Sequence, residues 1–310
     1  MTHSSVTVTL LGPQRRPTLD TVAASLYPEG PVATITAGWQ EREPDDGELS
    51  KLLGARDVNL RLYRRLLDVQ ERDPEFALGE RKLAAVLDEL QDLYLLRLDH
   101  ALQAVYAVQR RSGGQRLRAD VLAEAVGAVR DLDAAHLRRV GAVRGEFYEG
   151  LRPHDRAIIA EHRADVTGLL ADAAAVVVAG GHVGVLADAL HLFNIAASLR
   201  SPVIAWSAGA MALTDRIVLF SDRAPQGPGH PEVYGTGLSL LRNLVALPHA
   251  SARLLLGDTP RMAVFARRFA PARCVLLEPG TRVDMDDDGD RLPGTRVLAA
   301  DGHVTTLEAA

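Results

Sequence analysis

Apolar and polar residues follow two different periods along this 310-residue chain. Short apolar or alternating runs predict strands, at residues 6–11, 32–38, 57–63, 175–179, 202–206, 243–247 and 274–277. Segments with apolar residues three and four apart predict helices between them, at 19–26, 46–53, 154–171, 184–199 and 259–269. The acidic run at 286–289 is typical of a hairpin turn. Strands that alternate with helices predict an α/β fold, with a mostly parallel sheet, helices on both faces and ligands at the carboxyl ends of the strands.

The pattern changes between about residues 64 and 152. Apolar residues recur at helical spacing from Leu83 to Val108, Ser112-Gly113-Gly114 interrupts them, and the repeat resumes from Val121 to Val140. This predicts a helical hairpin inserted into the α/β fold. We therefore divide the chain into an α/β core, residues 1–63 and 154–310, and a helical insertion, residues 64–153. The insertion is expected to form a cap or a homo-oligomer interface, and a solvent-facing appendage is the alternative.

Composition narrows the class of protein. Hydrophobic residues make up 47% of the chain and the net charge is −5, which indicates a soluble globular protein without a basic surface for nucleic acid. Cys274 is the single cysteine, so a disulfide framework and a multi-cysteine metal site are excluded. The first residues lack a basic segment followed by an apolar one, and no apolar run is long enough to cross a membrane. A reducing cytoplasm is the expected location.

The segment PVIAWSAGAMAL, residues 202–213, carries a candidate nucleophile. An apolar strand runs into Ser207 and then directly into helix-forming residues. A serine at such a sharp turn projects above the sheet, and small neighbours permit the turn. The backbone N–H of Ala208 would lie at a helix start and could donate to a developing oxyanion. The alternative is that small residues only allow a helix to pack close to the sheet.

A base and an orienting acid follow at the ends of later strands. His249 ends the run NLVALP, and Glu278 ends the run CVLL in the sequence LLEPG. A serine nucleophile needs a base, and the base needs an acid that orients it, so we expect Ser207, His249 and Glu278 to form a triad. The alternatives for the two residues, each taken alone, are that His249 is structural and that Glu278 is only a turn residue before Pro279-Gly280.

A second oxyanion donor is expected where the strand at 175–179 ends in Gly180-Gly181. Glycine permits a backbone that turns its N–H inward, which makes Gly181 the candidate donor. The sequence GGHVG matches neither the dinucleotide fingerprint nor a phosphate-binding P-loop.

These segments together resemble the peptidase E and cyanophycinase group of serine hydrolases. The resemblance rests on the strand followed by GG, on WSAGA, on Pro248-His249 and on the turn LEPG, and it covers about residues 1–63 and 154–310. It implies a flavodoxin-like fold of the class I glutamine amidotransferase-like superfamily. It also implies a Ser-His-Glu triad at Ser207, His249 and Glu278.

The resemblance further implies substrate-binding residues. Asp222, fifteen residues after Ser207, matches an aspartate that matters in the peptidase E branch, although it could be an exposed loop residue. Gly180 and His182 belong to a loop that lines the pocket in the family. The pair His182-Val183 departs from the family's usual residues, and the alternative role of His182 is to cover a helix end. Arg223 or Arg253 could pair with a substrate carboxylate. The loop 223–237 is expected to be a mobile flap.

These features predict a serine-type peptidase or amidohydrolase that acts on a small peptide or isopeptide, with aspartyl-containing peptides implied by the resemblance. No cofactor and no catalytic metal are expected. The glutaminase reaction is disfavoured because Ser207 stands where a cysteine is needed. The serious alternative is a non-catalytic member of the same fold that acts as a binding or assembly protein.

Overall fold

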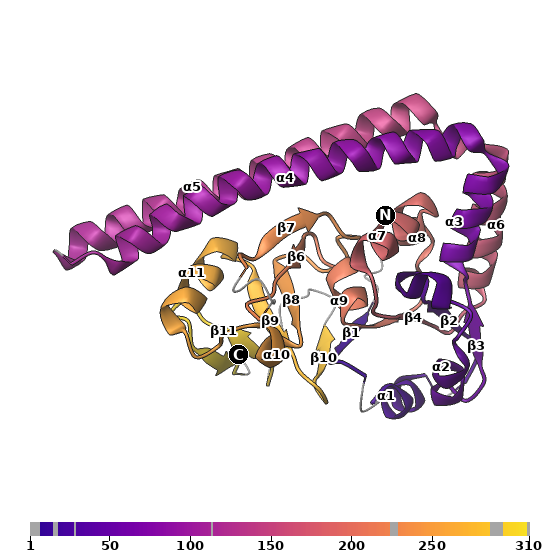
Figure 1. Cartoon of the computed structure of the whole chain (residues 1–310). Coiled ribbons are helices and arrows are strands. Elements are labelled where there is room, and N and C mark those ends of the chain that lie inside the picture. The colour runs from indigo at the N-terminus through magenta and orange to yellow at the C-terminus, as the bar shows by residue number, and fades with distance from the viewer. Residues whose placement is uncertain are drawn as a thin grey trace, which may run out of the picture.

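The computed structural model describes residues 7–14, 18–27, 29–112, 114–223, 229–285 and 294–308. Its largest sheet has six strands in the order β10-β1-β5-β4-β2-β3, and every neighbouring pair is parallel except β1 with β10. The chain therefore has a mixed α/β fold with a mostly parallel sheet (Figure 1). The strands are β1 (Val8–Leu11), β2 (Val32–Ile35), β3 (Asp57–Asn59), β4 (Ala175–Val178), β5 (Val203–Trp206) and β10 (Arg282–Met285).

Both faces of this sheet are buried. Val176 and Val178 of β4 lie in one apolar cluster, and Ala175 and Val177 lie in another, because successive side chains of a strand point to opposite faces. One face is covered by α3 (Leu62–Arg72), α6 (Ala157–Ala171) and α7 (Val183–Leu192), and the other by α1 (Leu19–Leu26) and α2 (Gly47–Leu52). Valine-rich runs without polar alternation are what a strand buried on both sides requires.

Apart from β10, the strands that follow β5 do not join this sheet. A four-stranded sheet in the order β12-β11-β9-β8 pairs β8 with β9 in parallel and the others antiparallel. A third sheet pairs β6 with β7. These strands are β6 (Ile217–Leu219), β7 (Glu232–Gly235), β8 (Leu244–Pro248), β9 (Arg273–Leu277), β11 (Arg296–Leu298) and β12 (Val304–Thr306). The prediction of a mobile flap over 223–237 is therefore wrong for residues 232–235, which form a strand. The hairpin turn expected at 286–289 lies outside the described residues.

Two further sequence-based boundaries differ from the structure. The strand expected over 57–63 ends at Asn59, because Arg61 takes a left-handed conformation and α3 begins at Leu62. The single helix expected over 184–199 is broken at Asn194, which has a φ of 53° and separates α7 from α8 (Ile195–Ser198). Short elements complete the chain: η1 (Ala37–Arg42), η2 (Pro153–Asp155), α9 (Ala208–Ala212), α10 (Ala250–Arg253) and α11 (Thr259–Phe269).

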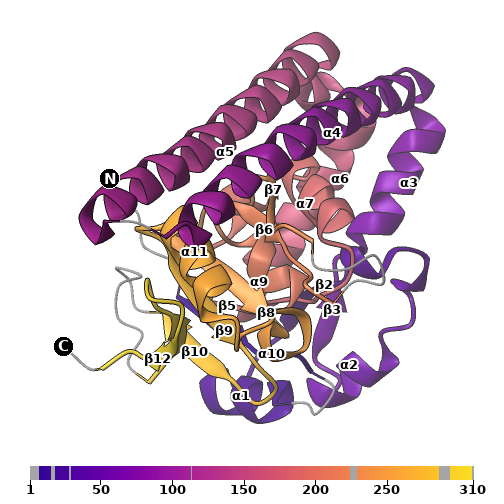
Figure 2. The same cartoon turned by 60° about the vertical axis from the view of Figure 1, so that its left-hand side comes forward.

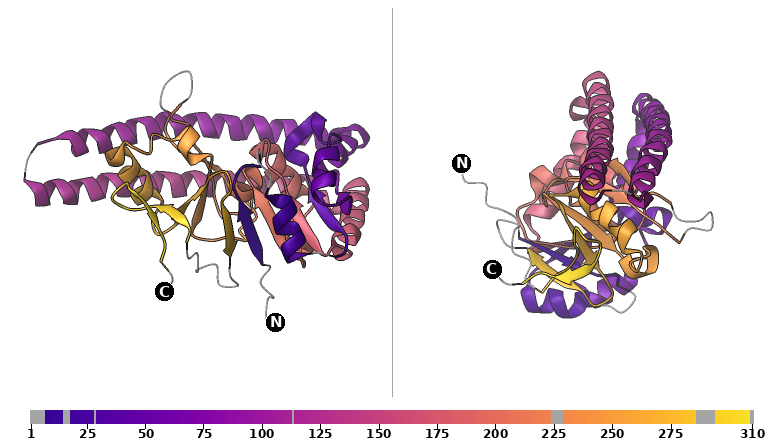
Figure 3. Two further views of the ribbon diagram at one scale, coloured as in Figure 1. Left: turned by 90° about the horizontal axis from the view of Figure 1, so that it is seen from below. Right: turned by 90° about the vertical axis from the view of Figure 1, so that its left-hand side faces the viewer.

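Two long helices, α4 (Pro74–Arg110) and α5 (Gln115–Leu151), pack against each other as a hairpin. Each has 37 residues, which corresponds to a length of about 55 Å. Asp73 caps the start of α4 by accepting a hydrogen bond from the Phe76 N–H, and Pro74 occupies the first helical position. In Figures 1 and 3 the hairpin runs along one side of the body, from α3 and α6 to α11. None of the helices in the described part of the chain is both long and apolar enough to cross a membrane.

The hairpin shares a core with the sheets beside it. Leu98, Leu102 and Val129 of the hairpin lie in one apolar cluster with Val233 of β7 and Phe265 of α11. Figure 2 shows α11 and the β6–β7 sheet between the hairpin and the rest of the body. Burial of these side chains stabilises the attachment through the hydrophobic effect, at about 1.5 to 3 kcal/mol for each fully buried side chain.

A buried polar network fixes the position of the hairpin. The Arg268 guanidinium donates two hydrogen bonds to the Asp133 carboxylate, both of 2.7 Å, one to the Pro231 carbonyl and one to the Tyr94 hydroxyl. The Tyr94 hydroxyl donates to Asp133 and accepts from the Val233 N–H. Burial raises the pKa of Tyr94, so it remains a neutral donor. Because the charges are paired and four hydrogen bonds hold the guanidinium, one arginine joins α4, α5, β7 and α11.

We expect Arg268→Met to lower the free energy of unfolding by about 3 kcal/mol, because it leaves the buried Asp133 carboxylate without its cation. Urea denaturation measures the change. Arg138→Met, at an exposed site on α5, is the control and should change stability by less than about 0.5 kcal/mol. Replacing Asp133 by Leu in the Arg268→Met variant should recover part of the loss. Similar stability for Arg268→Met and the control would contradict this role.

Candidate active site

Ser207 lies at the turn from β5 into α9, with φ 53° and ψ −123°. A non-glycine residue with positive φ is strained, and strained residues are concentrated at functional sites. The turn holds the half-buried serine at the carboxyl end of β5, which is the edge where parallel sheets bind ligands. Ala208, the first residue of α9, is buried, and its backbone N–H lies at the start of the helix.

The Gly180-Gly181 segment lies beside Ser207. β4 and β5 are paired so that Gly180 is level with Ser207, and a Cβ on Gly180 would lie 2.9 Å from the Ser207 Cβ and 3.3 Å from its Oγ. Gly181 has a φ of 124°, and a Cβ there would collide with the Gly38 carbonyl oxygen. The His182 N–H donates to that same Gly38 oxygen at 2.7 Å. Glycine is therefore required where this loop passes Ser207 and Gly38.

The His182 side chain caps a helix. Its Nδ1 accepts a hydrogen bond from the Val185 N–H at 3.2 Å, so the ring covers the start of α7. The space beside Gly184 is bounded by the His182 ring and the Tyr234 hydroxyl. Tyr234 belongs to β7, which therefore borders the loop that follows Gly181.

His249 and Glu278 end two neighbouring strands. β8 and β9 are parallel, Pro248 is level with Leu277, and His249 and Glu278 follow directly. The His249 N–H donates to the Leu277 carbonyl at 3.1 Å. Glu278 Oε1 accepts hydrogen bonds from the Ser251 N–H at 2.6 Å and from the Ser251 hydroxyl at 2.7 Å. Both side chains are half-buried, so they remain open to solvent on one side.

Two packing relations bring these strand ends to the edge that carries Ser207. β1 and β5 are parallel with Leu11 level with Trp206, so Gly12 lies next to Ser207, and a Cβ on Gly12 would collide with the Glu278 carbonyl oxygen. In addition, α9 packs against β8, and a bridge between Thr214 and Leu241 joins the far end of α9 to the segment before β8. Ser207 and His249 therefore lie toward the same edge.

The residues around this edge include two that the sequence did not single out. Ser251 holds the Glu278 carboxylate, and Gly12 lets the 278–281 turn close on β1. That turn has Pro279 and Gly280 at its central positions, with a φ of 83° at Gly280, and the Thr281 N–H donates to the Glu278 carbonyl at 2.9 Å. The glycine directly after the run VTVTLL was a usable signal for Gly12, whereas nothing in the sequence indicates Ser251.

Asp222 is bound by the segment between α10 and α11 and by the first turn of α11. It is buried. Its carboxylate accepts hydrogen bonds from the Arg261 guanidinium, of which the shortest is 2.6 Å long, and one of 3.0 Å from the Leu255 N–H. The reading of Asp222 as an exposed loop residue is therefore wrong, and its ion pair orders the segment after α10. Arg223 is exposed. Within the described residues, no cluster of three histidine, cysteine or acidic side chains could hold a metal ion.

The chain is thus an α/β protein with a serine at a strained strand-to-helix turn. No family model matches the sequence, and no curated protein matches it. Among solved structures, the crystal structure of a peptidase from an acI-B1 Actinobacterium aligns with 99% of this chain and 96% of its own chain, with a TM-score of 0.45 and 14% sequence identity.

Backbone strain at position 207 predicts an order of stabilities. Ser207→Gly should be more stable than Ser207→Ala by about 1 kcal/mol, because glycine adopts the positive φ without strain. The control pair is Ser25→Ala and Ser25→Gly, at an exposed site in α1. Here the alanine variant should be the more stable by a similar amount, because alanine favours a helix over glycine. Urea denaturation of the four variants measures both differences. An alanine variant at 207 that is at least as stable as the glycine variant contradicts the strain.

Cys274 should be unreactive in the folded protein. It is 1% exposed, and burial raises the pKa of its thiol to about 12, so almost no thiolate exists at neutral pH. We expect iodoacetamide to leave the native protein unmodified and to alkylate it after unfolding in guanidinium chloride, as measured by intact mass. The thiol-free Cys274→Ala variant is the control, and rapid alkylation of the folded protein would contradict the burial.

Proposed function

We propose that this protein is a serine-type peptidase or amidohydrolase that acts on a small peptide or isopeptide, with aspartyl-containing peptides as the substrate class. The observation that carries the proposal is the backbone of Ser207, which is held at positive φ between β5 and α9 with Gly180 against its side chain. Such strain needs compensation from the surrounding structure and is typical of a nucleophile held at a sharp turn.

His249 and Glu278 have complementary roles in this proposal. The His249 imidazole takes the proton from Ser207 Oγ as the oxygen attacks the substrate carbonyl, and later delivers it to the leaving amine. Glu278 orients the imidazole and stabilises its charged form. The hydrogen bonds from Ser251 to one oxygen of Glu278 support this role, because they fix the direction of the carboxylate and leave its other oxygen for the imidazole.

The Gly181 and Ala208 amides stabilise the oxyanion in this mechanism. The positive φ of Gly181 and the position of Ala208 at the start of α9 support the assignment. One such donor contributes roughly 3 to 4 kcal/mol to the lowering of the barrier. Water then attacks the acyl-enzyme, and the His249 imidazole acts as its base.

The loop after Gly180 and the exposed Arg223 are the proposed substrate-binding elements. The Arg223 guanidinium can pair with a carboxylate of the substrate. The His182 ring uses Nδ1 for its helix cap, which leaves Nε2 for the substrate. The parallel run β3-β2-β4-β5 follows the order of the first four strands of a flavodoxin-like sheet, although β1 occupies the fifth position, and this run supports a flavodoxin-like fold of the class I glutamine amidotransferase-like type. A glutaminase is disfavoured because the single thiol, Cys274, is buried within β9.

A fluorophosphonate probe tests the proposal, because it reacts with activated serines. The wild-type protein should form one adduct, located on Ser207 by peptide mass spectrometry. Ser207→Ala should abolish labelling, and His249→Ala and Glu278→Gln should slow it by about a hundredfold or more. Ser112→Ala, at an exposed site next to α4, is the control and should label like wild type.

Hydrolysis of dipeptides and β-aspartyl peptides, followed by the release of amine, provides the second readout. Turnover that is lost in Ser207→Ala and retained in Ser112→Ala supports a peptidase. The absence of both adduct and turnover in folded protein would instead favour a non-catalytic binding or assembly protein.

A further inference from the structure

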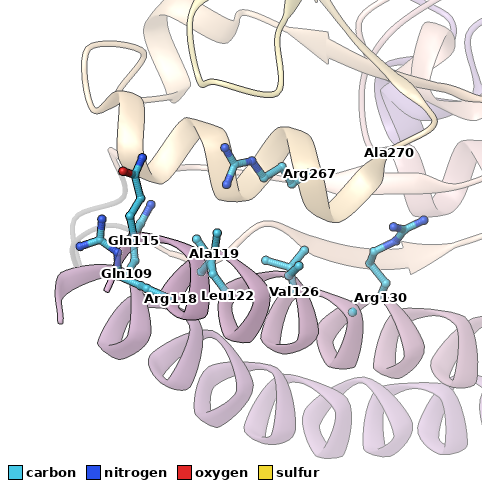
Figure 4. A pocket seen from close by; sticks show the side chains of 11 residues that line it. Gln109, Gln115, Arg118, Ala119, Leu122, Val126, Arg130, Arg267 and Ala270 are labelled. Carbon is cyan, nitrogen blue, oxygen red and sulfur yellow. The ribbon is translucent and has the colours of Figure 1, made fainter. Parts of the chain in front are cut away.

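A large cavity lies between α5 and α11, near the tip of the helical hairpin (Figure 4). Its volume of about 610 Å³ is within the range of small-molecule and peptide sites. One face of α5 contributes Ala119, Leu122 and Val126, which point toward α11 in Figure 4. Arg267 of α11 and Ala270, which directly follows α11, form the opposite side. The cavity therefore has an apolar floor that is formed by one helix.

Hydrogen bonds at both ends of α11 hold this cavity open. At the start of α11, Gln109 Nε2 donates to the Pro260 carbonyl at 2.9 Å. In its last turn, Arg268 binds Asp133 of α5 through two hydrogen bonds. Because α11 is attached to the hairpin at two points, its distance from α5 is set without a ligand.

The charges around the cavity all have one sign. Arg118, Arg130 and Arg267 line it, and among the residues that the structure describes no carboxylate does. None of the three forms an ion pair with a carboxylate of the described residues. Arg118 donates to the Arg111 carbonyl and Arg267 to the Ala300 carbonyl, which restricts both side chains and leaves their other N–H groups for a ligand. In a protein with a net charge of −5, such a cluster is a local feature that favours an anion.

The spacing of the charges favours an extended ligand. Arg118 and Arg130 are twelve residues apart on one helix, which corresponds to about 18 Å along its axis. A single phosphate or carboxylate cannot reach both, whereas an extended peptide of about six residues spans this distance. The floor of Leu122 and Val126 adds apolar contacts that a purely charged ligand cannot use.

We propose that this cavity binds an acidic peptide segment, whose carboxylates pair with Arg118, Arg130 and Arg267 while apolar side chains pack on Leu122 and Val126. Arginine is suited to this role because its planar group pairs with carboxylates through two hydrogen bonds. The site is formed by the hairpin and α11 and does not involve Ser207, so the proposal stands whether or not the protein is a hydrolase.

The test uses a fluorescein-labelled peptide of about six residues with alternating Glu and Leu, and the same peptide with Gln in place of Glu. Fluorescence anisotropy measures binding to the full-length protein, and mass spectrometry checks that the peptide stays intact. The Glu peptide should bind at least about tenfold more tightly than the Gln peptide, with an affinity that falls as salt rises.

Two variants, a triple arginine variant and Gly127→Leu, locate the site, and a second triple arginine variant is the control. Arg118→Gln, Arg130→Gln and Arg267→Gln together should weaken binding by about tenfold or more. The matched control replaces three exposed arginines outside the cavity, Arg116, Arg138 and Arg296, with Gln. Gly127→Leu keeps every arginine but adds a bulky side chain to the lining of the cavity, where a Cβ at Gly127 meets no atom within 4 Å. It should also weaken binding, whereas the control triple variant should bind within about twofold of wild type.

Equal binding of the Glu and Gln peptides would overturn the proposal, and so would an equal loss in the two triple variants. Retained affinity in Gly127→Leu would move the binding away from the cavity. Competition separates the ligand classes. If inorganic phosphate or a short single-stranded RNA displaces the labelled peptide at lower concentrations than the unlabelled peptide does, the assignment to an acidic peptide is wrong.

Discussion

The edge that carries Ser207 depends on backbone segments that approach one another more closely than side chains permit. Gly180 passes the side chain of Ser207, and Gly12 passes the carbonyl of Glu278. Any larger residue at these two positions would push β4 from β5 or the 278–281 turn from β1. Because interiors are closely packed, neither shift could be absorbed locally. Because Gly180 and Gly12 have no side chains, strands from two different sheets can end at the same edge of the molecule.

The helical hairpin is coupled to this edge through β7. Val233 of β7 donates to Tyr94 within the network around Arg268, and the next residue, Tyr234, lies beside Gly184 and the His182 ring. Neighbouring residues of a strand point to opposite faces, so β7 contacts the hairpin on one side and the start of α7 on the other. A buried charge pair far from Ser207 along the chain therefore sets the position of a strand that borders the candidate active site.

Local patterns predicted the elements of this fold better than their arrangement. The helical period across 83–140 indicated α4 and α5, and the apolar runs indicated β1, β2, β4 and β5. Apolar runs do not specify which sheet a strand joins, so the separate sheet of β8 and β9 was not foreseen. The break at Asn194 was also missed, because the apolar period continues through it while its backbone takes a left-handed conformation.

Residue type and position at strand ends are sufficient to propose Ser207, His249 and Glu278, because parallel strands bring their carboxyl ends to one edge. They are not sufficient for residues whose role depends on a distant partner. Asp222 pairs with Arg261, and this pairing leaves no trace in the local sequence of either residue. The same holds for the arginines of α5 and α11, which lie far apart in the chain. Each belongs to an ordinary polar helix face, and only the packing of α11 on the hairpin turns them into a single cationic cavity.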